Sequence, residues 1–139
     1  MDALTALLGS AALHAGFQAV VTLVVYPALA ATGERDWAQV HAAHSRRIAP
    51  VVAVVYLSVL GTWAWVLAVH PLTGWLVAAG AGSALAGGAT ALVAGPTHTR
   101  LSRRGPRPEL LRRLLRADAL RLAGALVALA GTLGAVAQG

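Results

Sequence analysis

Residues 37–50 read WAQVHAAHSRRIAP, and they lead directly into the apolar run VVAVVYLSVLGTWAWVLAV of residues 51–69. On a helix, Trp37, His41 and His44 share one face, because they follow one another at steps of four and three. Two arginines come next, immediately before the apolar run. The stretch therefore predicts a helix that brings imidazole and guanidinium groups to the place where the chain enters a membrane.

The composition supports a membrane protein. The chain has 139 residues, of which 58% are hydrophobic and only 12% are charged, whereas soluble domains carry about 25% charged residues. The sequence has no cysteine, which excludes disulfides, thiolate metal sites and a cysteine nucleophile. We therefore expect a single domain with an all-α fold, an integral membrane antiparallel four-helix transmembrane bundle.

Four apolar segments define this single domain of residues 1–139. The predicted spans cover about residues 4–31, 38–69, 73–95 and 108–137. Proline is expected to interrupt helices, so we predict a break at Pro50 in the second span and bends at Pro27 and at Pro96.

The third span is rich in small residues. Gly80, Ala84, Gly88 and Ala91 fall on one face of its helix, and this spacing lets helices approach closely in lipid. The face is therefore a candidate surface for a homo-oligomer.

The arginines predict the orientation. All eleven basic residues are arginine, and they cluster around the connection between spans one and two and the connection between spans three and four. By the positive-inside rule, both connections lie in the cytoplasm and both termini lie outside a plasma membrane. Membrane lipids are expected partners. Nucleic acid is not, although the pI is about 11.6, because the charge belongs to a membrane interface.

This topology brings polar residues of all four spans to one membrane face, and ionisable groups in such a place predict a site. In chain order the candidates are His14, Gln18, Tyr26, Trp37, His41, His44, Arg46, Arg47, His98, Arg100, Asp118 and Arg121. The first span contributes a polar stripe at steps of four, from Ser10 to Tyr26. Hydrogen bonding between helices is the alternative role for His14 and Gln18.

Three chemistries remain open for these side chains. His41, His44 and His98 could be ligands of a metal or of haem, could form structural hydrogen bonds, or could transfer protons. The arginines at span ends could hold an anionic group of a lipophilic ligand. Asp118 lies three residues before Arg121, so the two could form an ion pair that is structural or part of a site.

Four short motifs carry a family resemblance: VVYPAL at residues 24–29, HAAHSRRIAP at 41–50, GPTHTRL at 95–101 and LLRADALR at 114–121. The chain resembles a family of small bacterial four-span membrane proteins of unknown function that includes the anthrone oxygenases of polyketide pathways. Pro96, His98 and Leu101 match the P-x-H-x-x-L element of that family. Asp118 and Arg121 stand where the family carries an Asn-x-x-Arg-like element, so the acid is a departure.

The resemblance implies a lipophilic, often aromatic substrate that is oxidised by O₂. Such a reaction needs no cofactor when the substrate forms an electron-rich anion, although haem, copper or iron stays open. We therefore expect an oxidoreductase of oxygenase type, with His41 or His44 as the base and Arg121 or Arg47 holding the anion. The alternative is a non-catalytic membrane subunit or a haem- or metal-binding module.

Overall fold

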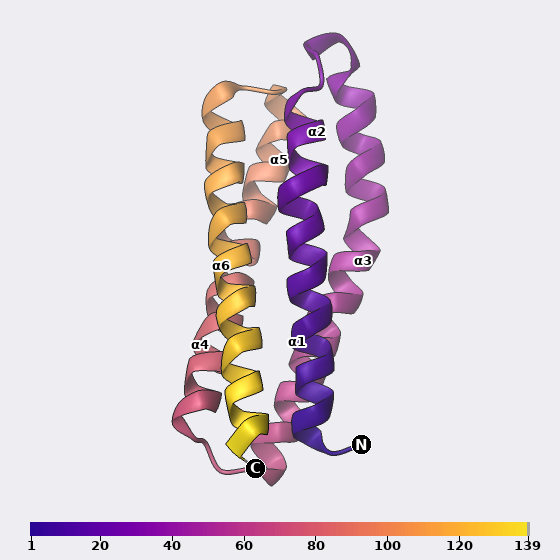
Figure 1. The fold of residues 1–139 in the computed structure, drawn as a ribbon. Helices are drawn as coiled ribbons and strands as arrows, with labels where there is room; N and C mark the ends of the chain where they lie inside the picture. The colour runs from indigo at the N-terminus through magenta and orange to yellow at the C-terminus, as the bar shows by residue number, and fades with distance from the viewer. Residues whose placement is uncertain (139) are drawn as a thin grey trace.

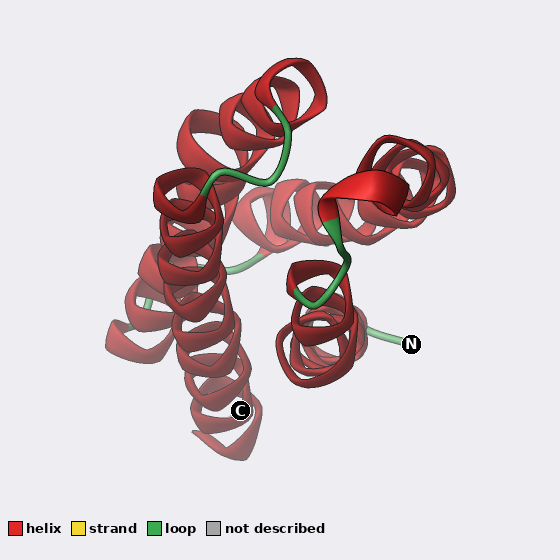
Figure 2. Cartoon of the chain, turned by 90° about the horizontal axis from the view of Figure 1, so that it is seen from above, coloured by secondary structure: helices red, strands yellow, loops and turns green. Residues whose placement is uncertain are grey.

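The structure is a computed structural model that describes residues 1–138. Within them, four helices are long and apolar enough to cross a membrane, and short loops join them (Figure 2). The predicted all-α, four-helix transmembrane bundle is confirmed. The spans run alternately up and down, so both termini lie at one end of the bundle (Figure 1). The connections 31–33 and 105–107 lie at the opposite end, together with the arginines that flank them, and this is hereafter the Arg-rich end.

Two of the spans contain a π-helical segment, and two are single α-helices. The first span consists of α1 (Ala3–Val20), η1 (Val21–Val25) and α2 (Tyr26–Ala30). The third span repeats this plan with α4 (Gly74–Gly88), η2 (Ala89–Ala94) and α5 (Gly95–Arg104). The second and fourth spans are α3 (Glu34–Val69) and α6 (Pro108–Gln138).

Pro50 and the end of the third span differ from the prediction. No break occurs at Pro50, because α3 continues through it and the exposed proline ring points away from the helix packing. The third span also extends beyond residue 95 and ends at Arg104. Pro27 and Pro96 each follow a π-helical segment. The wider π-helical turn accommodates a residue that lacks an N–H and whose ring would clash with the preceding turn.

A glycine-lined contact joins α4 to α6. A Cβ atom built on Gly82 would lie 2.5 Å from the carbonyl oxygen of Gly124, and one on Gly131 would lie 2.7 Å from the amide nitrogen of Ala79. The helices approach this closely only because these side chains are absent. The predicted face of Gly80, Ala84, Gly88 and Ala91 is not this contact, and all four residues line a groove beside α3.

The outer surface of the bundle is apolar. Leu23, Leu57 and Leu92 are about two thirds to three quarters exposed, as expected where lipid replaces water. The interior holds one apolar cluster at each end, around Leu101 and Leu114 near the Arg-rich end and around Leu7 and Val66 near the termini. Buried polar side chains lie between and beside these clusters, and they form the candidate site.

Candidate functional site

The π-helical segments position two side chains of the site. In the first span the amide of Tyr26 donates to the carbonyl of Val21, and in the third the amide of Gly95 donates to the carbonyl of Thr90, each five residues back. Residues at steps of four drift by about 40° per step around an α-helix. The wider turn of η1 takes back part of that drift, so Tyr26 at the end of the polar stripe is buried like His14.

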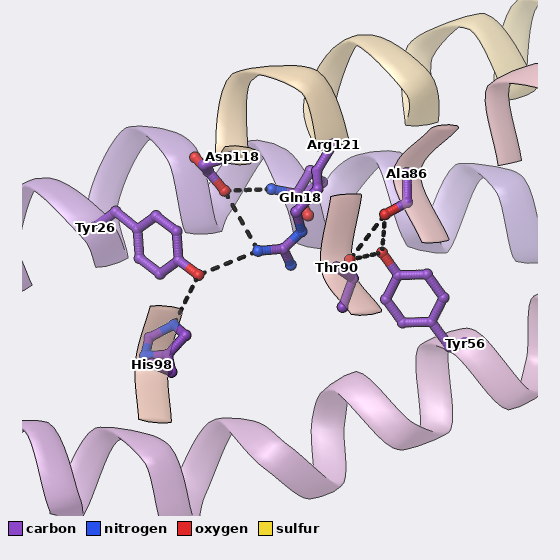
Figure 3. A network of polar contacts seen from close by, with 8 residues as sticks. All are labelled: Gln18, Tyr26, Tyr56, Ala86, Thr90, His98, Asp118 and Arg121. Carbon is purple, nitrogen blue, oxygen red and sulfur yellow. Dashed lines mark hydrogen bonds and ion pairs between the residues drawn. The ribbon is translucent and has the colours of Figure 1, made fainter. Parts of the chain in front are cut away.

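One hydrogen-bonded chain connects three spans through Tyr26 (Figure 3). Arg121 Nη1 of α6 lies 3.1 Å from Tyr26 Oη, and His98 Nε2 of α5 lies 3.1 Å from the same oxygen. Arg121 is also 3.7 Å from Asp118 Oδ1, to which Gln18 Nε2 donates over 2.6 Å. The Asp118 and Arg121 side chains are almost fully buried, so their charges must satisfy one another within the bundle.

The chain continues from His98 toward the Arg-rich end. His98 Nδ1 lies 3.1 Å from His41 Nε2, and His41 Nδ1 lies 3.3 Å from Ser102 Oγ. Ser102 is exposed and donates to the backbone carbonyl of His98, one turn earlier in α5. Trp37 fixes the imidazole of His41 from the other side, because their rings stack at 5.1 Å and the indole N–H donates to the carbonyl of Leu101.

An apolar pocket of about 360 Å³ opens beside this chain. Its walls come from all four spans, with Phe17 and Val21 on one side and Ile48 and Val52 of α3 on the other. The polar part of its lining is Tyr26, Ser45, Thr90, His98 and Arg121. The volume falls within the range of small-molecule sites, which is about 300–1,000 Å³.

One donor of the Arg121 guanidinium has no partner within residues 1–138. The residue is 3% exposed and lines the pocket, yet its Nε atom makes no hydrogen bond in this part of the chain. Buried donors of this kind are rare in proteins and call for an explanation. A second guanidinium nitrogen is committed to Tyr26 and Asp118. The arrangement suits an anionic or carbonyl oxygen in the pocket as the partner of Nε.

The structure brings together eight of the candidates from the sequence and leaves four outside the chain. The eight are Gln18, Tyr26, Trp37, His41, His44, His98, Asp118 and Arg121. Arg46, Arg47 and Arg100 are exposed on the surface, so they are not placed to clamp a ligand beside Arg121. His14 lies apart from the hydrogen-bonded chain, with its ring edge against Tyr56 at a centroid distance of 4.9 Å.

We expected His41 or His44 to face the ligand, but neither of them lines the pocket. His44 stacks on His98 at 5.8 Å and lines, with Arg47, a separate pocket between α3 and the end of the first span. His41 lies behind His98, and only His98 of the three lines the pocket that Arg121 lines. The histidine matched by the P-x-H-x-x-L element therefore has the position from which it could contact a ligand.

The three histidines do not converge as ligands of one ion. Within residues 1–138, no three His, Asp or Glu side chains are placed to hold a metal together. The rings of His41 and His44 both stack on that of His98, and the nitrogens of His41 and His98 that face each other are hydrogen-bonded. Hydrogen bonding and proton transfer fit this geometry better than metal ligation.

Two groups of residues in the site were not among the candidates. Ser102 lies among the arginines of residues 100–104, which in the sequence indicate only the orientation in the membrane. Its position four residues after His98 would have placed it on the same helical face as that histidine. Tyr56 and Thr90 form a second cluster beside the pocket. Tyr56 Oη lies 2.6 Å from Thr90 Oγ1 and 3.2 Å from the carbonyl of Ala86 (Figure 3).

Comparison with known proteins adds no relative to this description. The chain matches no protein-family model, and the searches of curated proteins and of solved structures give no match.

Proposed function

We propose that this chain is a membrane enzyme that removes a proton from a lipophilic ring compound and then allows O₂ to oxidise the resulting anion. One observation carries the proposal: buried Arg121, whose Nε has no hydrogen-bond partner within residues 1–138, lines an apolar pocket that Tyr26 and His98 also line. An apolar pocket favours a hydrophobic ring, and a guanidinium at its wall favours the anion over the neutral molecule.

Tyr26 and His98 supply the base. The phenol oxygen of Tyr26 has a lone pair left for a substrate proton when its own proton goes to His98 Nε2, 3.1 Å away. The substrate's C–H bond breaks, its electron pair stays on the ring system as an enolate, and Arg121 Nε–H donates to the enolate oxygen. General-base catalysis of this kind contributes about 10²–10⁴-fold to a rate.

Anthrone illustrates the whole reaction, and the family resemblance suggests it as a probe. Its methylene carbon loses a proton, and the enolate gives its electrons to O₂ to form a peroxide at that carbon. The peroxide takes up a proton and loses water, which leaves a carbonyl group. Anthrone and O₂ thus give anthraquinone and water, so that one oxygen atom enters the product and the other leaves as water.

We also propose that the Arg-rich end faces the cytoplasm, because arginines flank both of its connections. The chain has no cysteine, so single cysteines report on sidedness. A membrane-impermeant maleimide should label Pro71→Cys in intact cells and should label Pro106→Cys only after lysis. The reverse pattern would place the site at the outer face.

The test of the activity is anthrone oxidation by purified protein, followed by O₂ uptake and by the absorbance of anthraquinone. We expect acceleration over the spontaneous reaction and the loss of that acceleration in His98→Gln. His70→Gln is the matched control, since His70 lies in the turn at the opposite end of the bundle and should leave the rate unchanged. The proposal fails if the wild-type protein does not accelerate the reaction, or if both variants behave alike.

A further inference from the structure

The hydrogen-bonded chain reaches beyond the base. We infer that His98, His41 and Ser102 form a proton relay that carries the substrate's proton from Tyr26 to the Arg-rich end. The inference deepens the proposed function, because it assigns the route by which the base is emptied. Neither His41 nor Ser102 lines the pocket of Tyr26, His98 and Arg121, so both act through His98 and are not in contact with substrate.

The direction of the relay follows from the exposed end of the chain. Ser102 Oγ donates its one hydrogen to the carbonyl of His98, which can only accept. Toward His41 Nδ1 at 3.3 Å, Ser102 is therefore the acceptor, and His41 carries its hydrogen on Nδ1. A neutral His41 then accepts at Nε2, so the hydrogen in the 3.1 Å contact with His98 belongs to His98 Nδ1.

The contacts at the buried end accommodate the same direction. Arg121 can only donate, so Tyr26 Oη accepts from it over 3.1 Å. The hydroxyl hydrogen of Tyr26 remains available for His98 Nε2, which is an acceptor when His98 carries its hydrogen on Nδ1. The exposed end thus assigns the Nδ1–H form to His98, and the hydrogen bonds at Tyr26 are compatible with it. Every hydrogen of the relay points from the pocket toward Ser102.

This polarity lets one proton cross without leaving a charge on the way. The substrate's proton goes to Tyr26 Oη as the hydroxyl proton goes to His98 Nε2. The Nδ1 proton of His98 goes to His41 Nε2. The Nδ1 proton of His41 then goes to Ser102 Oγ, as the Ser102 hydroxyl turns from the carbonyl of His98 and releases its own proton to water. Each ring gains one proton and loses one, so the products are the substrate anion in the pocket and one proton in water.

The relay also crosses from a closed to an open environment. Tyr26 is 4% exposed and His41 is 2% exposed, whereas Ser102 is exposed in the last turn of α5. Without such a path, the proton taken from the substrate would stay on His98 beside the buried Arg121, where like charges repel.

The first test is independent of activity. NMR of protein labelled with nitrogen isotope in the histidine rings reports which nitrogen carries the proton. We expect both His41 and His98 in the Nδ1–H form at a pH where they are neutral, whereas free histidine mostly carries its proton on Nε2. In Ser102→Ala, the Nδ1–H form of His41 should lose its partner and the tautomer should shift toward Nε2–H. Nε2–H rings at both positions in the wild type would overturn the relay.

The second test uses anthrone turnover and chemical rescue. His41→Ala should lower kcat by about a hundredfold, the lower end of the range for proton transfer, with KM unchanged because His41 does not line the pocket. Added imidazole should restore much of the lost rate by taking the place of the missing ring. Ser102→Ala should lower kcat less, and Thr99→Ala is the control, since Thr99 bonds only the carbonyl of Gly95 on the outside of α5.

The two tests separate the relay from the proposed function. Nδ1–H rings in a protein that does not oxidise anthrone would retain the directed chain and refute the anthrone reaction as its use. An active protein whose His41→Ala variant keeps the wild-type rate would retain the enzyme and refute the relay. A rate loss in His41→Ala that imidazole does not restore would make His41 a structural support of His98.

Discussion

Adding a methyl group at Gly82 should weaken the contact between α4 and α6. A Cβ atom there would lie 2.5 Å from the carbonyl oxygen of Gly124 and 2.6 Å from the amide nitrogen of Ala128. Both atoms belong to backbone, so no side chain can move aside. The helices would have to separate by about 1 Å to reach ordinary contact, and overpacking of this kind costs about 1–3 kcal/mol.

Gly88→Ala is the matched control for Gly82→Ala. Both glycines lie in α4, but a Cβ atom on Gly88 meets nothing within 4 Å. Replacing a glycine in a helix by alanine favours the helix by about 0.5–1 kcal/mol in each variant. The difference between the two free energies of unfolding therefore isolates the clash, which we expect at about 1–3 kcal/mol.

The assay is unfolding of the purified protein in detergent micelles with increasing dodecyl sulfate, followed by circular dichroism. Gly88→Ala should unfold at the wild-type midpoint or above it, and Gly82→Ala should unfold below it. Equal midpoints for the two variants would refute the close approach of α4 and α6. Size-exclusion chromatography of the same samples should show no change in oligomeric state for Gly82→Ala, because its contact lies within one chain.

Three further predictions concern single side chains. Trp37→Phe should retain the ring stacking on His41 but lose the 3.3 Å hydrogen bond to the carbonyl of Leu101, which lowers the free energy of unfolding by about 1 kcal/mol. Pro50→Ala should raise the unfolding midpoint, because it restores an N–H within a continuous helix. Asp118→Leu alone should destabilise by about 3–5 kcal/mol because it strands a buried guanidinium, whereas Asp118→Leu combined with Arg121→Met should recover most of that loss. If the double variant is stable but does not oxidise anthrone, the Asp118–Arg121 pair is part of the site. If it is stable and active, the pair serves only the stability of the fold.

The fold was predictable from the sequence because lipid imposes few choices. Long apolar segments must be helices, and their polar stripe must face inward. The steps of four from Ser10 to Tyr26 predicted that stripe, and Gln18 and Tyr26 from it contact Asp118, Arg121 and His98 in the structure.

The errors came from effects that a sequence pattern does not express. The rule that proline interrupts a helix applies to a regular α-helix. In this protein π-helical segments precede Pro27 and Pro96, and α3 continues through the exposed Pro50. The face of Gly80 and Gly88 has the spacing of a helix contact, but Gly82 has the contact. Several faces of α4 carry small residues, so spacing alone could not choose among them.

The exposed position of Arg46, Arg47 and Arg100 has a similar origin. Their neighbours on the same helices, His41 and His98, are drawn inward by the stacking of rings and by hydrogen bonds. Arg100 lies two residues after His98, and Arg46 and Arg47 lie five and six residues after His41. Each residue turns the helix by about 100°, so all three arginines start on faces turned away from these imidazoles. Only Arg121, three residues after an acid that it can pair with, is stabilised in the interior.

The packing divides the bundle into a fixed part and a part that could open to admit a ligand. The backbones of α4 and α6 are in direct contact at their glycines. Because no side chain there can move aside, we expect the adjacent wall of the pocket, which carries Arg121, to be rigid. α3 faces α4 across a groove of about 620 Å³, and the side chains of Tyr56 and Trp63 bridge it through hydrogen bonds to Thr90 and Ser83. That groove shares Thr90 and part of α3 with the pocket. Opening the pocket toward lipid would break the side-chain hydrogen bonds of Tyr56 and Trp63, each worth about 1 kcal/mol, and would leave the contact between α4 and α6 intact. We accordingly expect a lipophilic substrate to enter from the bilayer between α3 and α4, and its proton to leave at the Arg-rich end.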